Sequence, residues 1–314
     1  MKEILSVNNL TKSFAGKTVV NNISFDLQRG NIMGLLGPNG AGKTTAIRII
    51  MGILHADKGK VNFYFNGTNS SMDKTKIGYL PEERGLYDDA KVLETLVYLA
   101  SLKGMPREKA QKEGTQWLER VGLSEYANQK LEKLSKGMQQ KVQFIAAILH
   151  HPELVMLDEP FSGLDPLNQE FIKDTIRELQ REGLTIIISA HQMNLVEELC
   201  DSLVMINKGR QVLSGKLAEI KGGYREHKVK VYHSEIENTS FLQNMPDIVI
   251  EKREQHRTIF RYSGANNINE LLQNICGKIT VEEIIVEKPP LHDIFIQTAK
   301  ERGEDVEELE MEQY

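Results

Sequence analysis

Short apolar runs alternate with amphipathic stretches along the first two thirds of the chain. The runs Ile23–Leu27 and Ile32–Leu36 predict strands that lead into a glycine-rich loop, and the next stretch, Thr44–Met51, predicts a helix. Further strands are predicted at Val61–Phe65, Ile77–Leu80, Leu154–Leu157, Thr185–Ser189 and Ser202–Ile206. The pattern is helical from about Val92 to His150 and again at Gln169–Gln180. This alternation predicts an α/β fold with a mainly parallel central sheet.

The pattern changes after Gly222 and Gly223, which we take as a domain boundary. Beyond them, strands are predicted at Val229–Tyr232, Ile248–Glu251, Thr258–Tyr262 and Thr280–Val286, and helical stretches at Ile236–Asn244, Ile268–Cys276 and Leu291–Lys300. The order β-α-β-β-α-β with a final helix predicts a small α+β domain. We therefore expect one domain over residues 1–222, a small C-terminal domain over 223–300, and an acidic, flexible tail over 301–314.

The acidic charge of the chain is concentrated at its C-terminal end. The 314 residues include 39 Lys and Arg and 44 Asp and Glu, so the net charge is −5. The last fourteen residues alone carry −6, which leaves +1 for the remainder. A body without excess positive charge disfavours a nucleic-acid partner.

Other sequence features predict a cytoplasmic protein without a membrane span of its own. Two cysteines, Cys200 and Cys276, are too few for a disulfide framework, and the opening MKEILSVNNL lacks the apolar core of a secretion signal. The longest stretch without charge, Gly183–Val196, has 14 residues. A spanning helix requires about 18 to 20. A role at a membrane would therefore require a separate membrane protein.

A phosphate-binding pattern directly follows the run Ile32–Leu36. It reads Gly37-Pro38-Asn39-Gly40-Ala41-Gly42-Lys43-Thr44-Thr45 and satisfies G-x-x-x-x-G-K-[ST]. Its glycines allow backbone N–H groups to converge on an anion, and the N-terminus of the next helix faces the same charge. Lys43 is expected to reach the β- and γ-phosphates, and the Thr44 hydroxyl to ligate Mg²⁺.

Two acidic residues follow the apolar run Leu154–Leu157. A charge at the carboxyl end of a buried strand points into the crevice where α/β sheets bind ligands. We expect Asp158 to hold Mg²⁺, directly or through water, and Glu159 to polarise the attacking water. Taken alone, the pair could also be a solvated turn.

The segment Leu134-Ser135-Lys136-Gly137-Met138-Gln139-Gln140-Lys141 resembles the LSGGQ signature of ABC transporter ATP-binding subunits. The resemblance covers residues 1–222, with departures at Lys136 and Met138. It implies a P-loop ATPase fold that adds an antiparallel β subdomain and a helical signature subdomain to the central sheet. It also implies a head-to-tail dimer in which Ser135, Gly137 and Gln139 contact the ATP of the second copy. Ser135 equally suits the N-cap of the helix that follows.

The same resemblance implies roles for four further residues. Phe14 lies where an aromatic side chain stacks on adenine, with a core position as the alternative. Glu82 takes the place of a glutamine that binds Mg²⁺, and Glu83 is the rival assignment. Asp165 belongs to the loop that contacts the other subunit and also suits a helix cap. His191 is expected to contact the γ-phosphate and, with Lys43 and Glu159, to complete the catalytic set.

Together these features predict an ATP-binding and ATP-hydrolysing subunit that drives an integral membrane permease from the cytoplasmic face. A homodimer, or a pair with a paralogous ATPase subunit, would enclose two Mg-ATP. The phrases YLPEERGLY and PPLHDIFIQ are similar to sodium-efflux-type exporter ATPase subunits, which favours export. The alternative is a soluble ABC ATPase that acts on ribosomes or nucleic acid. Such proteins usually carry two nucleotide domains and basic linkers, whereas this chain has one phosphate loop, one signature and no basic block.

Overall fold

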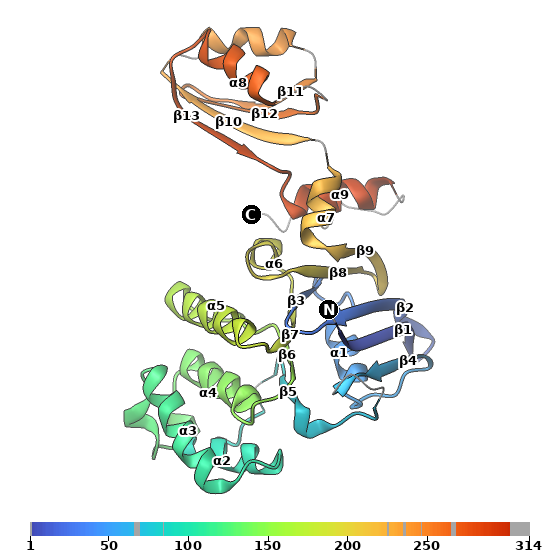
Figure 1. The fold of residues 1–314 in the computed structure, drawn as a ribbon, viewed down its shortest axis with the longest axis vertical. Helices are drawn as coiled ribbons and strands as arrows, with labels where there is room; N and C mark the ends of the chain where they lie inside the picture. Colours follow the sequence, from blue (N-terminus) through green and yellow to red (C-terminus); the bar gives the residue numbers. More distant parts are fainter. Residues whose placement is uncertain are drawn as a thin grey trace. The chain divides into compact units, whose positions relative to one another are not determined.

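The computed structural model describes residues 2–65, 70–83, 85–224, 226–234, 237–245, 247–264 and 268–301. The chain divides into two compact units, Met1–Gly215 and Lys216–Tyr314, which Figure 1 shows coloured along the sequence. The boundary lies earlier than predicted, because Gly222 and Gly223 end a helix of the second unit, α7 (Leu217–Gly223), and are not a linker. Apart from Glu301, the predicted acidic tail lies outside the described residues.

The first unit is built on a nine-stranded sheet. Its described helices and strands are β1 (Glu3–Phe14), β2 (Lys17–Gln28), β3 (Ile32–Leu36), α1 (Lys43–Ile50), β4 (Lys58–Phe63), η2 (Lys74–Lys76), β5 (Ile77–Leu80), α2 (Val92–Leu102), α3 (Arg107–Arg120), η3 (Ser124–Tyr126), η4 (Leu131–Lys133), α4 (Lys136–Ile148), β6 (Leu154–Asp158), α5 (Pro166–Arg181), β7 (Thr185–Ala190), α6 (Met193–Leu199), β8 (Ser202–Asn207) and β9 (Arg210–Lys216). The strand order is β4-β1-β2-β9-β8-β3-β7-β6-β5. The strands from β8 to β5 pair in parallel, whereas β1 pairs antiparallel with β2 and β4. The predicted mainly parallel sheet with an antiparallel β subdomain is confirmed.

The central strands are buried along their whole length. Every residue of β3, β6 and β7 is buried, as expected for parallel strands covered on both faces. Their sequences are therefore nearly continuous apolar runs. The long strand β1 has no such run, since Asn8 and Asn9 interrupt its apolar pattern, and Asn9 adopts a left-handed backbone with φ 52° beside shifts in register. The sequence pattern did not predict β1 for this reason.

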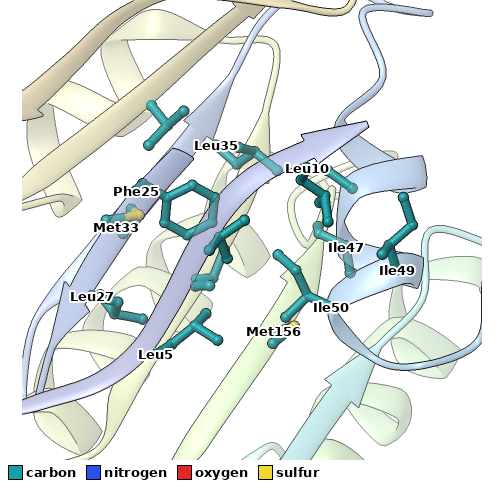
Figure 2. Close-up of a cluster of buried hydrophobic side chains, with 14 of the residues drawn as sticks. Leu5, Leu10, Phe25, Leu27, Met33, Leu35, Ile47, Ile49, Ile50 and Met156 are labelled. Atoms are coloured by element: carbon teal, nitrogen blue, oxygen red, sulfur yellow. The ribbon is translucent and has the colours of Figure 1, made fainter. Parts of the chain in front are cut away.

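One apolar core joins the antiparallel strands to the central sheet. Figure 2 shows its side chains from β1, β2, β3, α1 and β6, among them Leu5, Leu10, Phe25, Leu27, Met33, Leu35, Ile47, Ile49, Ile50 and Met156. Close packing of such side chains holds the end of β3 and the first turns of α1 in place. The phosphate loop between these two elements is thereby fixed at both ends.

The predicted helical region forms a separate subdomain of the first unit. Helices α2, α3 and α4 enclose a second apolar core, which includes Val92, Leu96, Leu118, Val142 and Ile145. The predicted helical signature subdomain is confirmed. None of the helices in the described part of the chain combines the length and apolar character that crossing a membrane requires.

The second unit is an α+β domain, as predicted. After α7 it contains β10 (His227–His233), η5 (Glu237–Asn244), β11 (Ile248–Arg253), β12 (Arg257–Tyr262), α8 (Ile268–Cys276), β13 (Val281–Glu287) and α9 (Leu291–Glu301). Its four described strands form an antiparallel sheet in the order β11-β12-β10-β13. Leu242 of η5 and Leu271 and Ile275 of α8 pack on Val229 and Val231 of β10. The helix predicted at 236–244 is a 3₁₀-helix, and Ile236 lies outside the described residues.

Candidate functional site

The phosphate loop connects the buried end of β3 to the start of α1. Gly42 is the N-cap of α1 and adopts a left-handed backbone with φ 107°. A Cβ atom at Gly42 would lie 2.5 Å from the carbonyl oxygen of Val19, and one at Gly37 would lie 2.1 Å from that of Ile206. Both approaches are shorter than any real contact, so only glycine fits at these two positions. The loop therefore forms a tight backbone cradle at a helix N-terminus, which suits a phosphate group.

The Lys43 side chain lies across this loop. Its buried ammonium donates hydrogen bonds to the carbonyls of Gly37 at 2.7 Å and Pro38 at 3.3 Å. The same nitrogen lies 3.3 Å from Glu159 Oε1. Lys43 thus places a positive charge between the loop and the carboxylate of Glu159, the residue that follows β6.

Three oxygen-bearing side chains meet beside the loop. The Thr44 hydroxyl lies 3.2 Å from Asp158 Oδ1 and 3.3 Å from Glu82 Oε2. Asp158 is fully buried, and its Oδ2 has no hydrogen-bond partner among the described residues. Burial raises the pKa of Asp158, and the nearby carboxylates of Glu82 and Glu159 add to the rise. A divalent cation would relieve this cost, and hydroxyl and carboxylate oxygens are the ligands that Mg²⁺ prefers.

Glu159 lies at the turn that follows β6. Its backbone is left-handed with φ 49° although it carries a side chain. Its Oε2 lies 2.9 Å from Nδ1 of His191, which follows β7. The Glu159 carboxylate therefore sits between the His191 ring and the Lys43 ammonium, with 10% of its side chain exposed.

These groups surround one pocket of about 330 Å³. Its lining includes Asn39–Thr45 of the phosphate loop together with Val19, Glu82 and Glu159. Asp158 and His191 join it through their contacts with Thr44 and Glu159. The structure thus brings together the loop, the two acids after β6, Glu82 and His191, which the sequence places far apart. Glu83 points elsewhere, with 87% of its side chain exposed and Arg48 at 3.8 Å.

The signature residues lie apart from this pocket. Ser135 is the N-cap of α4, and its hydroxyl accepts a hydrogen bond from the Met138 N–H at 3.3 Å, which confirms its predicted capping role. Gln139 donates to the carbonyls of Leu131 and Leu134, so its side chain holds the turn before α4. Neither these residues nor Gly137 line the pocket. Their contact with nucleotide stays a prediction, and it requires a second copy of the chain.

Phe14 and Asp165 also lie outside the pocket lining. Phe14 ends β1 with 44% of its surface exposed, so it is not a core residue, and Lys12 Nζ lies 5.4 Å from its ring centroid. Asp165 caps α5 by accepting a hydrogen bond from the Asn168 N–H at 3.1 Å, which holds the pKa of this carboxyl below its usual range. The predicted cap is confirmed. The roles of Phe14 toward adenine and Asp165 toward a second subunit stay predictions.

Sequence reasoning missed Ser189, which touches both acids after β6. Its hydroxyl donates to Asp158 Oδ1 at 2.5 Å and accepts from the Glu159 N–H at 2.9 Å. The sequence offers only a weak indication of this role, because Ser189 is a single hydroxyl residue that follows three isoleucines in a buried strand, two residues before His191.

Comparison with known proteins finds two regions of similarity. Residues 20–162 match the ABC transporter family, and residues 215–299 match the C-terminal domain of DrrA1-3-like ATP-binding proteins. The uncharacterized ABC transporter ATP-binding protein YhaQ of Bacillus subtilis is 43% identical over 94% of this chain and 98% of its own length. The linearmycin resistance ATP-binding protein LnrL of the same organism is 37% identical over 69% of this chain and 70% of its own length.

Similarity to solved structures supports the same fold. The structure of an ATP binding subunit of an ABC transporter is 30% identical, with a TM-score of 0.63 over 70% of this chain and 92% of that one. An ATP-binding cassette of an ABC transporter in its ADP conformation is 25% identical, with a TM-score of 0.60 over 70% of this chain and 93% of that one.

Proposed function

Because this chain belongs to the ATP-binding proteins of ABC transporters, we propose that it hydrolyses Mg-ATP and thereby drives export through a separate membrane permease. One observation carries the proposal: Lys43, Glu159 and His191 converge on the pocket of the phosphate loop, beside the buried Asp158. A glycine-rich cradle, a cation, a divalent-metal site and a carboxylate base are the parts that phosphoryl transfer to water requires.

Each residue has a chemical task in this proposal. The loop N–H groups and Lys43 hold the β- and γ-phosphates, and Thr44, Asp158 and Glu82 hold Mg²⁺. Bound Mg²⁺ would neutralise part of the phosphate charge. Glu159 accepts a proton from the attacking water, whose oxygen bonds to the γ-phosphorus as the bond to the β-phosphate oxygen breaks. His191, at 2.9 Å from Glu159, keeps that carboxylate directed at the water.

The signature residues at the start of α4, the exposed Ser135 and the half-buried Gly137, support a head-to-tail dimer. Ser135 and Gly137 stand at the N-terminus of α4, where backbone N–H groups and the helix dipole favour an anion. They do not line the pocket of their own chain. In the proposed dimer they meet the γ-phosphate held by the second copy, and hydrolysis releases that contact, so the two copies separate.

The surface of the helical subdomain supports a membrane partner. Tyr98 and Leu102 lie four residues apart on α2 with 57% and 63% of their surface exposed, and Tyr87, in the loop before α2, is 79% exposed. Exposed aromatic and aliphatic side chains of this size are typical of protein interfaces. Export is favoured by the similarity to LnrL, which is named for linearmycin resistance.

Replacing both Tyr98 and Leu102 with glutamate is expected to abolish association with the permease while the ATPase rate of the isolated chain stays at the parental level. Burying two unpaired carboxylates in a protein interface removes them from water, which carries a large free-energy penalty. The measurement is co-purification of integral membrane proteins with this chain from detergent extracts of the cells that produce it. Val249→Glu is the control, since Val249 is also 57% exposed but belongs to the second unit. Recovery of ribosomes without a membrane protein would favour the soluble ATPase instead.

A Mg²⁺ titration tests the assignment of Glu82. Replacement by glutamine removes one negative charge 3.3 Å from the Thr44 hydroxyl, so we expect the Mg²⁺ concentration for half-maximal ATPase to rise about three- to tenfold. Glu83→Gln, which alters the exposed neighbour, should leave this concentration unchanged. The reverse pattern would transfer the role to Glu83.

A further inference from the structure

One buried hydroxyl connects the two acidic residues at the end of β6. Strands β6 and β7 pair in parallel with Asp158 opposite Ser189. Ser189 is fully buried. Its Oγ donates to Asp158 Oδ1 at 2.5 Å and accepts from the Glu159 N–H at 2.9 Å. A serine hydroxyl has one donor and two acceptor sites, so both contacts can exist at the same time.

The contact with Glu159 acts on a strained backbone. Glu159 carries a side chain and has φ 49°, so its backbone occupies the left-handed region, which is unfavourable for residues other than glycine. The Glu159 N–H bond to Ser189 is one interaction that holds the chain in this turn. This backbone turn also directs the Glu159 carboxylate towards His191 and Lys43. The position of the carboxylate therefore depends on the hydroxyl across the strand pair.

The contact with Asp158 fixes the other acid. Hydrogen bonds from a hydroxyl to a carboxylate are stronger than neutral ones, and this one lies in a fully buried site. Oδ1 accepts hydrogen bonds from both Ser189 and Thr44, whereas Oδ2 has no hydrogen-bond partner among the described residues. The orientation of the Asp158 carboxylate beside Thr44 is thus set in part from β7.

We propose that Ser189 is a positioning residue that couples the Mg²⁺ ligand Asp158 to the base Glu159, so that one hydroxyl sets both groups for ATP hydrolysis. This inference rests on the proposed ATPase function. Ser189 itself is fully buried and does not line the pocket of the phosphate loop. It acts only through the positions of the two carboxylates.

Two variants of Ser189 test the coupling. In Ser189→Ala both contacts are lost, and we expect kcat to fall about 10- to 100-fold while KM for ATP changes less than about twofold. The Mg²⁺ concentration for half-maximal activity should rise several-fold in the same variant. Ser189→Thr keeps the hydroxyl and suits a strand, so it should recover most of both losses. Ser202→Ala is the matched control, because Ser202 is also a buried strand serine but begins β8, where it pairs with Met33 of β3 and not with β6 or β7.

A purely structural role predicts a different result. Loss of packing alone would lower the free energy of unfolding but leave kcat and the Mg²⁺ dependence of the folded protein at parental values, and that result overturns the coupling. A fall in kcat with parental Mg²⁺ dependence overturns it as well. If the alanine variant does not fold, Ser189→Cys keeps the volume, replaces the hydroxyl by a weak thiol donor, and is judged by the same two criteria. A parental protein without ATPase activity would instead refute the proposed function.

Discussion

Replacing Glu159 with glutamine is expected to lower the ATP hydrolysis rate about 100-fold or more while ATP binding stays near the parental affinity. Glutamine keeps the size and polarity of the side chain but cannot accept a proton from water at neutral pH. The carboxylate lies 2.9 Å from His191 and 3.3 Å from Lys43, so the change acts at the centre of the site. Steady-state phosphate release and equilibrium ATP binding measure the two quantities separately.

The same variant should also accumulate the ATP-bound dimer. If hydrolysis separates the two copies, a chain that binds ATP and does not hydrolyse it keeps them together. Size-exclusion chromatography with Mg-ATP is expected to show a dimer for Glu159→Gln and mainly monomer for the parent. Glu182→Gln, an exposed acid in the turn after α5, should behave as the parent does. Hydrolysis by Glu159→Gln at the parental rate would remove Glu159 from the role of base.

The parts of the fold that could be predicted are those with a strong apolar signal. The strand Ile32–Leu36 was predicted with its observed bounds, because a strand buried on both faces must be apolar throughout. Strand β1 was missed, since its two asparagines and shifted register break the alternation that identifies an amphipathic strand. The domain boundary was misplaced because a glycine pair ends helices as readily as it marks linkers.

The parts of the site that could be predicted are those within short motifs. Spacing alone places Lys43 and Thr44 after a glycine loop, and the ends of parallel strands meet at one edge of the sheet. Ser189 had no such motif. Its role depends on the register between β6 and β7, which places it opposite Asp158 and is set by the packing of both strands in the sheet. Long-range pairing of this kind is not encoded in the local pattern of either strand.

Gly37→Ala is expected to abolish ATP binding and hydrolysis, because the added methyl group cannot be accommodated. A Cβ atom at Gly37 would lie 2.1 Å from the carbonyl oxygen of Ile206. Ile206 belongs to β8, and its neighbour Met205 pairs with Leu36 of β3, so this carbonyl is held inside the central sheet. The loop must therefore move instead, and its N–H groups lose their common focus on the phosphate. We expect the ATP affinity to fall about 100-fold or more and the free energy of unfolding to fall by about 2 to 4 kcal/mol.

Gly40→Ala, in the same loop, is the matched control for Gly37→Ala. Gly40 has φ 76°, but nothing lies within 4 Å of a Cβ atom built there, so its substitution adds backbone strain of about 1 kcal/mol without a collision. Urea denaturation and equilibrium titration with a fluorescent ATP analogue compare the two variants. The structure requires a much greater loss of affinity for Gly37→Ala than for Gly40→Ala. Equal losses would show that backbone strain, and not the contact with β8, limits the loop, and the close approach at Ile206 would then have no part in shaping the phosphate cradle.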